Sequence, residues 1–266
     1  MNPRKAGMKE QVRAPRLLIV NADDANLTPG VSQAILEAHA TGIVTSTTLL
    51  VNLPLEATTV RAFKAAKSLG VGIHLNVTLG APVSSPQKLN SLISGDGMFR
   101  KRDSQVHHPP EKKEVALEYK DQILLFKKHF GRLPTHMDTH HQVHDHPLYW
   151  DALIKTAKYF RLPVRRSLLS GKMKRAMPAC AARVLGDLNP EGYWRKNALL
   201  SVLRSLAPGI SEVMCHPGIV DSDLRKITSF TTGRAHEFRL FRSPFLRRWI
   251  AAQGIRLTHY GMCYNW

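Results

Sequence analysis

A cluster of histidines and carboxylates lies between Thr135 and His146. These twelve residues read Thr-His-Met-Asp-Thr-His-His-Gln-Val-His-Asp-His and hold five of the chain's 13 histidines. Imidazole binds metals and carries protons near neutral pH, and a carboxylate can orient a ligand histidine or complete a coordination sphere. In an extended segment, His136, Asp138 and His140 share one face. The stretch therefore predicts a metal-binding strand end, with a solvated polar loop as the alternative.

Three further candidate sites follow short apolar runs. Asp23 and Asp24 come directly after Arg16–Asn21, and two adjacent carboxylates are costly to bury unless a cation or a proton separates their roles. An acidic helix-capping loop is the alternative reading of this pair. His74 and His216 also end apolar runs. A lone strand histidine is more often a core residue, so the case for His74 depends on other ligands at strand ends.

The elements that must position these residues alternate along the chain. Apolar, β-branched runs predict strands, and apolar residues at helical spacing between them predict helices. The expected strands are 16–21, 43–51, 71–75, a strand that carries His136 to His140, 162–166, 212–215 and 254–259. The expected helices start after Thr28 and run to Gly42, then cover 54–69, 111–130, 148–160 and 235–253, the last with a break near Pro244. A long polar loop is expected between Asn76 and Pro110.

About seven strands that alternate with helices predict an α/β fold with a parallel sheet. A (β/α) barrel and an open doubly wound sheet both fit, and in each the chemistry gathers at the carboxyl ends of the strands. Asp23, Asp24, His74, His140 and His216 all fall at such ends, so they are expected to converge. Residues 1–15 are expected to form a flexible tail before a single domain over 16–266.

The composition bounds the class of protein. The formal net charge is +18, and basic residues are concentrated between Arg161 and Arg204. The segment 161–207 is expected to be basic and helical, with breaks at Pro178 and Asn189-Pro190. A solvated surface is the preferred explanation, against an acidic substrate, a nucleic-acid partner or an anionic membrane. Three distant cysteines form no disulfide framework. No apolar signal segment is visible, so a cytoplasmic protein is expected.

An Asp with two histidines makes a mixed oxygen and nitrogen site that suits Zn²⁺, Mn²⁺, Fe²⁺, Co²⁺ or Ni²⁺, and less typically Mg²⁺. A metal there can lower the pKa of a bound water and polarise a carbonyl. The second Asp can take the proton of the water, and a histidine across the site, His216, can return one to a leaving amine. These parts together indicate hydrolysis of an amide or an ester.

The chain resembles the YdjC-like carbohydrate deacetylases, which include chitooligosaccharide deacetylases. The pieces that carry the resemblance cover nearly the whole chain, in order: Asn21-Ala22-Asp23-Asp24, Gly42-Ile43-Val44-Thr45-Ser46-Thr47, Gly72-Ile73-His74-Leu75-Asn76, Pro134 to His144, Cys215-His216-Pro217-Gly218, Thr231-Thr232-Gly233-Arg234 and Ile255 to Tyr260. The resemblance implies a distorted (β/α) barrel, a divalent metal ion, Mg²⁺ or Zn²⁺, and removal of an acetyl group from an N-acetylated sugar. A homodimer is implied only by analogy.

The resemblance also implies roles for single residues. Asp24, His74 and His140 would be the metal ligands, Asp23 the general base and His216 the general acid. A second group would support the ligands, orient the substrate or simply pack: His136, Asp138, His141, His144 and Arg234. The family usually has Phe-Gly where this chain has Ala25-Asn26, and often a Glu at Ala235. The first change is expected to remove an aromatic from the rim of the site and a glycine from a tight turn.

Three rival functions fit the same sequence. The substrate could be a lipid-linked or phosphorylated sugar at an anionic membrane surface, with peripheral membrane contact through the basic segment. The chain could be a non-catalytic metal- or sugar-binding protein. Charge alone could drive nucleic-acid binding, but no nucleic-acid motif accompanies it, so no nucleic-acid partner is expected. A Cys215–His216 nucleophile pair is not favoured, because strand neighbours point to opposite faces and the thiol is expected in the core.

Overall fold

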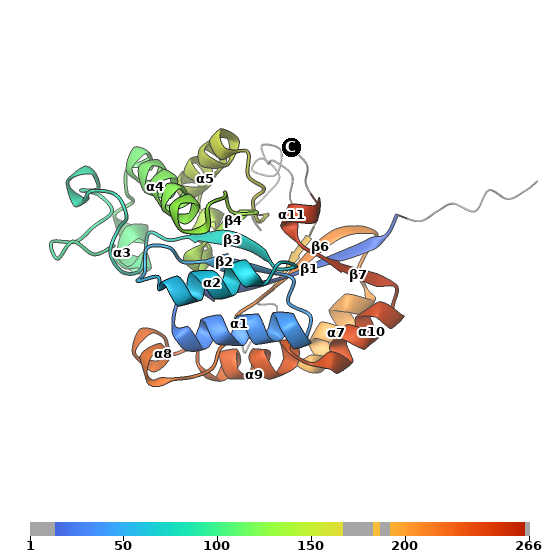
Figure 1. Cartoon of the computed structure of the whole chain (residues 1–266). Coiled ribbons are helices and arrows are strands. Elements are labelled where there is room, and N and C mark those ends of the chain that lie inside the picture. The colour runs from blue at the N-terminus through green and yellow to red at the C-terminus, as the bar shows by residue number, and fades with distance from the viewer. Residues whose placement is uncertain (1–13, 167–182, 187–191, 264–266) are drawn as a thin grey trace, which may run out of the picture.

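A parallel β-sheet runs through the centre of the molecule (Figure 1). The structure is a computed structural model that describes residues 14–166, 183–186 and 192–263. Its seven described strands are β1 Arg16–Ala25, β2 Ser46–Leu49, β3 Gly70–Leu75, β4 Met137–Thr139, β5 Arg183–Leu185, β6 Gly209–Cys215 and β7 Ile255–Thr258. Their order is β4-β3-β2-β1-β6-β5, with β7 also paired to β1. Every pairing between these strands is parallel, which confirms the expected α/β class and the distorted barrel.

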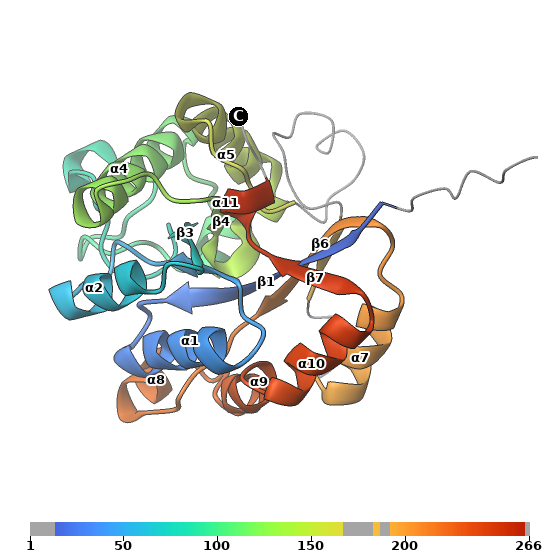
Figure 2. The same ribbon diagram turned by 45° about the vertical axis from the view of Figure 1, so that its right-hand side comes forward.

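Helices connect the strands and pack around the sheet (Figure 2). In both views α1, α8 and α9 lie below the strands, and α4 and α5 lie above them. The α-helices are α1 Pro29–Thr41, α2 Ala57–Ala65, α3 Arg102–His107, α4 Lys112–Phe130, α5 Pro147–Phe160, α7 Lys196–Arg204, α8 Ser222–Ile227, α9 Thr232–Phe241, α10 Pro244–Ala252 and α11 Tyr260–Cys263, and two 3₁₀ helices are η1 Pro86–Lys88 and η2 His140–Asp145. Among the described residues no helix is both long and apolar enough to cross a bilayer.

Strand β1 is the centre of the sheet because it pairs along both edges. One edge pairs with β6 from Arg16 to Ala22. The other edge pairs first with β7, over Arg16–Ile19, and then with β2, from Asn21 onward. Leu18, Ile19 and Val20 are fully buried, as expected of an apolar strand covered on both faces.

Helix α1 forms where the sequence signals place it. The Thr28 hydroxyl accepts a hydrogen bond from the Val31 amide at 3.3 Å, and Pro29 begins the helix. Val31 and Ile35 are fully buried on its inner face. The helix ends at Gly42, where a Cβ atom would lie only 2.0 Å from the Phe241 carbonyl oxygen. A larger residue would therefore separate α1 from the end of α9.

The basic segment 161–207 is not simply helical. Its described parts hold the three-residue strand β5, which pairs with β6, and the helix α7. The expected strand at 162–166 is reduced to one bridge between Val164 and Met137. Helix α7 was expected, but β5 was missed because so short a strand is defined by its pairing with β6 and carries little periodicity of its own. Residues 167–182 and 187–191, with Pro178, Asn189 and Pro190, and residues 1–13 of the expected tail lie outside the described part of the chain.

The long connection between β3 and α4 is more ordered than a polar loop. It contains η1 and α3 and is fastened to α4 by Glu118, a fully buried residue. The two Glu118 carboxylate oxygens accept hydrogen bonds from the Val83 and Ser84 amides, both at 2.9 Å. This attachment holds the connection beside the sheet edge, so that α3 reaches the mouth of the pocket described below.

Candidate active site

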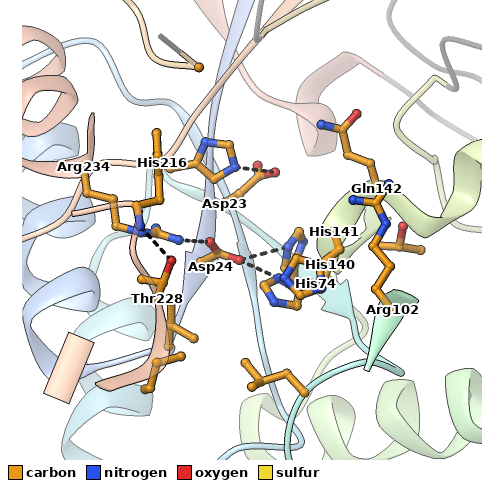
Figure 3. Close-up of a pocket in the computed structure, with 16 residues that line it drawn as sticks. Asp23, Asp24, His74, Arg102, His140, His141, Gln142, His216, Thr228 and Arg234 are labelled. Carbon is orange, nitrogen blue, oxygen red and sulfur yellow. Dashed lines mark hydrogen bonds and ion pairs between the residues drawn. The ribbon is translucent and has the colours of Figure 1, made fainter. Parts of the chain in front are cut away.

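A pocket of about 460 Å³ opens at the carboxyl ends of the strands. Asp23, Asp24, His74, His140 and His216 all line it, as the sequence predicts, and Figure 3 shows their side chains around one space. The other lining residues are Leu27, Leu79, Arg102, Thr139, His141, Gln142, Gly192, Ile227, Thr228, Phe230 and Arg234. Polar groups from β1, β3, β4, β6 and α9 thus converge on one cavity.

Asp24, His74 and His140 form a buried cluster with the geometry of a metal site. The Asp24 Oδ1 atom lies 3.2 Å from His74 Nε2 and 2.9 Å from His140 Nδ1. A carboxylate with two imidazoles is a donor set that divalent transition metals and Zn²⁺ prefer. The residues present therefore fit a divalent cation.

Asp138 orients the first of these histidines. Residue His74 pairs with Asp138 across β3 and β4, and its Nδ1 atom lies 2.6 Å from the Asp138 Oδ1 atom. Burial would lower the pKa of His74, but the carboxylates of Asp138 and Asp24 outweigh it and raise that pKa to about 10. Nδ1 is occupied by Asp138, so Nε2 is the nitrogen that faces Asp24. A ligand histidine held by an outer carboxylate is the usual arrangement at metal sites.

Two residues beside this cluster adopt left-handed backbone conformations. The φ angles are 67° at Asp24 and 70° at Asn26. Asn26 accepts this conformation more readily than most residues, and its side-chain amide donates to the Leu50 carbonyl at 2.9 Å. The chain therefore keeps the tight turn without glycine. Ala25 is fully buried in the core and does not line the pocket.

Arg165 organises the carboxylates below the pocket. Its guanidinium donates to both oxygens of Asp23 at 2.6 Å, contacts Asp138 Oδ2 at 2.9 Å, and donates through Nε to Glu212 Oε1 at 2.9 Å. Tyr260 donates to the other oxygen of Glu212. Asp23, His74 and Asp138 form a second possible metal-binding set, but Arg165 already supplies the positive charge between its two carboxylates. The Asp24 cluster is therefore the better cation site.

His216 lies beside Asp23 and not across the pocket from it. The His216 Nε2 atom is 3.9 Å from Asp23 Oδ2, and Figure 3 shows the two side chains together. Ala22 pairs with Cys215 across β1 and β6, so the residues that follow them, Asp23 and His216, lie side by side. The expectation that His216 lies across the site is therefore wrong, because neighbouring strands carry Asp23 and His216.

Arg234 contacts the candidate metal ligand from α9. Its Nη2 atom donates to Asp24 Oδ2 at 2.5 Å. Burial would raise the pKa of Asp24, but Arg234 and His140 outweigh it and hold that pKa well below its usual range. Arg234 thus keeps Asp24 ionised and turned toward the pocket.

Of the three remaining candidate histidines, one lines the pocket and two pack in the interior. His141 lines the pocket, and its Nδ1 atom lies 3.0 Å from the Thr78 hydroxyl. His136 is fully buried, stacks on Tyr260 and contacts Asn21 Oδ1 through Nε2 at 3.0 Å. His144 is buried outside the pocket, against the Thr139 hydroxyl at 2.5 Å.

The buried histidines predict a loss of stability in acid. Burial lowers the pKa of His144 to about 4 and that of His136 to about 3. Between these values and the unfolded value of 6.5, the unfolded chain binds more protons, so the free energy of unfolding falls as the pH falls. For His144 alone we expect about 2 kcal/mol between pH 7 and pH 5. Urea unfolding of His144→Asn should show a pH dependence smaller by that amount.

The exposed histidine His107 supplies the control for this measurement. His107→Asn makes the same exchange at an exposed side chain and so measures what a change of histidine to asparagine does on its own. An equal pH dependence in His144→Asn and the unchanged protein would assign the acid sensitivity to other groups.

Arg165, Glu212 and Glu237 are the main site residues that the sequence reasoning missed. Arg165 was counted only as part of a basic segment. Glu212 did carry a signal, because a lone carboxylate inside a buried apolar strand requires a cation or hydrogen-bond donors. Glu237 is buried on α9 and lies within an otherwise ordinary helical pattern. Cys215 is fully buried, as expected.

Comparison with known proteins agrees with this geometry. Residues 17–252 match the YdjC-like protein family. A carbohydrate deacetylase of Thermoanaerobacter pseudethanolicus is 33% identical over 250 residues, covering 93% of this chain and 99% of that protein. One from Geobacillus stearothermophilus is 33% identical over 255 residues, covering 94% and 99%.

Solved structures show the same fold. A candidate cellobiose-phosphate cleavage protein of Enterococcus faecalis superimposes with a TM-score of 0.85 at 28% identity, covering 94% of this chain and 99% of that one. A family 4 carbohydrate esterase of Streptomyces lividans has a TM-score of 0.51 at 13% identity, covering 92% of each chain, and shares the fold alone. The resemblance found in the sequence motifs is confirmed: the chain belongs to the YdjC-like protein family.

Proposed function

We propose that this chain is a metal-dependent hydrolase that removes the acetyl group from an N-acetylated sugar. The observation that carries the proposal is one pocket in which Asp23 and His216, 3.9 Å apart, lie beside the Asp24–His74–His140 cluster. The curated relatives named carbohydrate deacetylases support the reaction class.

A divalent cation held by Asp24, His74 and His140 would polarise the acetamide carbonyl and lower the pKa of a water molecule. Asp23 accepts a proton from that water as the water oxygen bonds to the carbonyl carbon. Protonated His216 donates its proton to the nitrogen as the carbon–nitrogen bond breaks, which releases acetate and the free amine. In the tetrahedral intermediate the attacking oxygen and the leaving nitrogen are bonded to the same carbon. A base and an acid that lie 3.9 Å apart can therefore take the proton from the oxygen and give one to the nitrogen.

Arg165 prepares Asp23 for this role. Both Asp23 oxygens accept hydrogen bonds from Arg165 at 2.6 Å. Oδ1 also accepts one from the Asn21 side-chain amide at 2.9 Å, so Oδ2 is the oxygen that keeps a lone pair for another proton. The guanidinium fixes the plane of the carboxylate and compensates its charge. Asp23 therefore stays in place during proton transfer.

Zn²⁺ is the metal that the donor set favours over Mg²⁺, because two of its three donors are imidazole nitrogens. The choice of metal is part of the proposal. It predicts that Zn²⁺ restores activity to chelated protein at lower concentration than Mg²⁺ does.

The experiment that tests the function measures acetate release from N-acetylglucosamine oligomers. Chelated protein should be inactive, and single metals added back should restore release. The deacetylated sugar, identified by mass, must appear in equal amount to the acetate. Tight metal binding without acetate release from any N-acetylated sugar would point instead to the non-catalytic binding protein.

A sugar that carries an anionic group is the second candidate substrate. Arg102 lines the pocket from the side opposite Arg234 (Figure 3), and its side chain is exposed. The E. faecalis neighbour, described as a candidate cellobiose-phosphate cleavage protein, is consistent with such a group. Phosphorylated and neutral forms of the same N-acetylated sugar in the acetate assay separate the two substrates by their KM values.

A further inference from the structure

Glu237 holds the main chain of His216. The His216 amide donates to Glu237 Oε2 at 2.5 Å, and the Trp194 amide donates to Glu237 Oε1 at 2.9 Å. Glu237 is 1% exposed. Burying a carboxylate is costly unless charge-assisted hydrogen bonds compensate. Each Glu237 oxygen accepts a hydrogen bond from a main-chain amide, so this carboxylate fixes the segment at His216 and the segment at Trp194.

The segment that begins at His216 lies between a strand and a helix, and the Ile219 amide, which donates to the Gly30 carbonyl at 3.3 Å, anchors it to α1. Strand β6 ends at Cys215, and the next helix, α8, begins only at Ser222. The Gly218 amide donates to the Arg234 carbonyl at 3.1 Å. Helix α9 thus holds the segment twice, at His216 through the Glu237 side chain and at Gly218 through the helix main chain.

The second main-chain partner of Glu237, the Trp194 amide, leads to the wall of the pocket. Trp194 is buried, and its indole nitrogen donates to the Met214 carbonyl at 2.8 Å, two residues before His216. Gly192, two residues before Trp194, lines the pocket. Glu237 therefore fixes His216 relative to both β6 and the pocket wall at Gly192.

We propose that Glu237 is a positioning residue for the proton donor His216. This inference rests on the proposed function, in which His216 protonates the leaving amine. Glu237 touches no reacting atom. It sets the direction in which the His216 side chain leaves the strand, and so the position of the proton relative to the nitrogen.

The role has a chemical signature that general destabilisation lacks. An amide needs its nitrogen protonated as the bond breaks, whereas 4-nitrophenyl acetate releases a stable anion without a proton donor. A displaced His216 should therefore slow hydrolysis of the N-acetylated sugar, an amide, and leave hydrolysis of 4-nitrophenyl acetate, an ester, nearly unchanged. A variant that merely loosens the fold should slow both.

The test compares Glu237→Gln with His216→Ala on the metal-loaded protein. We expect kcat for the N-acetylated sugar to fall about 10- to 100-fold in Glu237→Gln, with KM and ester hydrolysis changed less than about threefold. In the His216→Ala background, Glu237→Gln should change amide turnover less than about twofold, because both changes act through one proton donor.

Glu118→Gln is the matched control. Glu118 is also buried and also accepts two main-chain amides with its two oxygens, but it holds Val83 and Ser84. This variant should leave the ratio of amide to ester turnover unchanged. Should Glu237→Gln fail to fold, Glu237→Asp keeps the charge and withdraws the carboxylate, and it should show the same selectivity.

A second readout does not depend on activity. In protein labelled with ¹⁵N-histidine, the His216 amide proton should resonate far downfield because it bonds a carboxylate at 2.5 Å. It should move upfield in Glu237→Gln and stay in place in Glu118→Gln.

The outcomes separate this inference from the proposed function. If His216→Ala leaves turnover of the N-acetylated sugar unchanged, His216 is not the general acid and the proposed mechanism fails. If His216→Ala slows the amide selectively but Glu237→Gln slows amide and ester equally, or adds its full effect to His216→Ala, the positioning role of Glu237 is overturned while the function stands.

Discussion

Asp24→Ala and His140→Ala should each lose metal binding and acetate release together. Each variant removes one of three ligands from a cluster whose donor atoms all lie within 4.8 Å of one another. Loss of an outer carboxylate alone lowers metal affinity by about 10- to 100-fold, so loss of a direct ligand should cost more than about 100-fold. Titration calorimetry with Zn²⁺ on chelated protein, beside the acetate assay, measures both effects.

His141→Ala is the control for this pair. His141 lies next to His140 in sequence, lines the same pocket and contacts the Thr78 hydroxyl rather than Asp24. It should keep Zn²⁺ affinity within a few-fold of the unchanged protein. Metal binding that survives in Asp24→Ala at full affinity would place the cation elsewhere.

Asp23→Asn should keep the metal and lose turnover. The asparagine has the same shape, and its side-chain oxygen can still accept a hydrogen bond from Arg165. The charge of Arg165 remains compensated by Asp138 and Glu212. It cannot accept the proton of the water, and general bases of this kind contribute about 10²- to 10⁴-fold. We expect kcat to fall about 10³-fold while Zn²⁺ affinity stays within a few-fold.

Asp138→Asn provides the contrast. Asp138 contacts His74 at 2.6 Å and does not line the pocket, so its loss should weaken metal binding before it affects turnover at saturating metal. Turnover of Asp23→Asn close to that of the unchanged protein would remove Asp23 from the role of base.

The site residues that could be predicted from the sequence are those that lie at the ends of strands. Asp23, His74 and His216 lie at the ends of apolar runs and His140 at the end of the His-rich strand. Parallel strands bring such positions to one edge of a sheet. The order of the strands could not be read, so the sequence did not show that β1 and β6 are neighbours. For that reason His216 was expected across the site and is found beside Asp23.

Residues that act through long-range contacts were beyond sequence reasoning. Arg165 stands 142 positions from Asp23, with which it forms two hydrogen bonds, and no local pattern links the two. The backbone conformation of Asn26, in contrast, is determined locally. Its left-handed φ of 70° follows from the turn, and asparagine is among the residues that tolerate this conformation, so the exchange of glycine there changes little.

The contacts around the proposed base also bear on how the protein is made. Asp23 is held by Arg165, Arg165 by Glu212, and Glu212 by Tyr260 in the C-terminal helix α11. Strand β7, just before Tyr260, completes one edge of β1, the strand that carries Asp23. A growing chain thus exposes β1 early, but the contacts that hold Asp23 are complete only after Tyr260 has left the ribosome. Asp23 is therefore expected to gain its full support late in folding, after β7 and α11 have docked on β1 and Glu212.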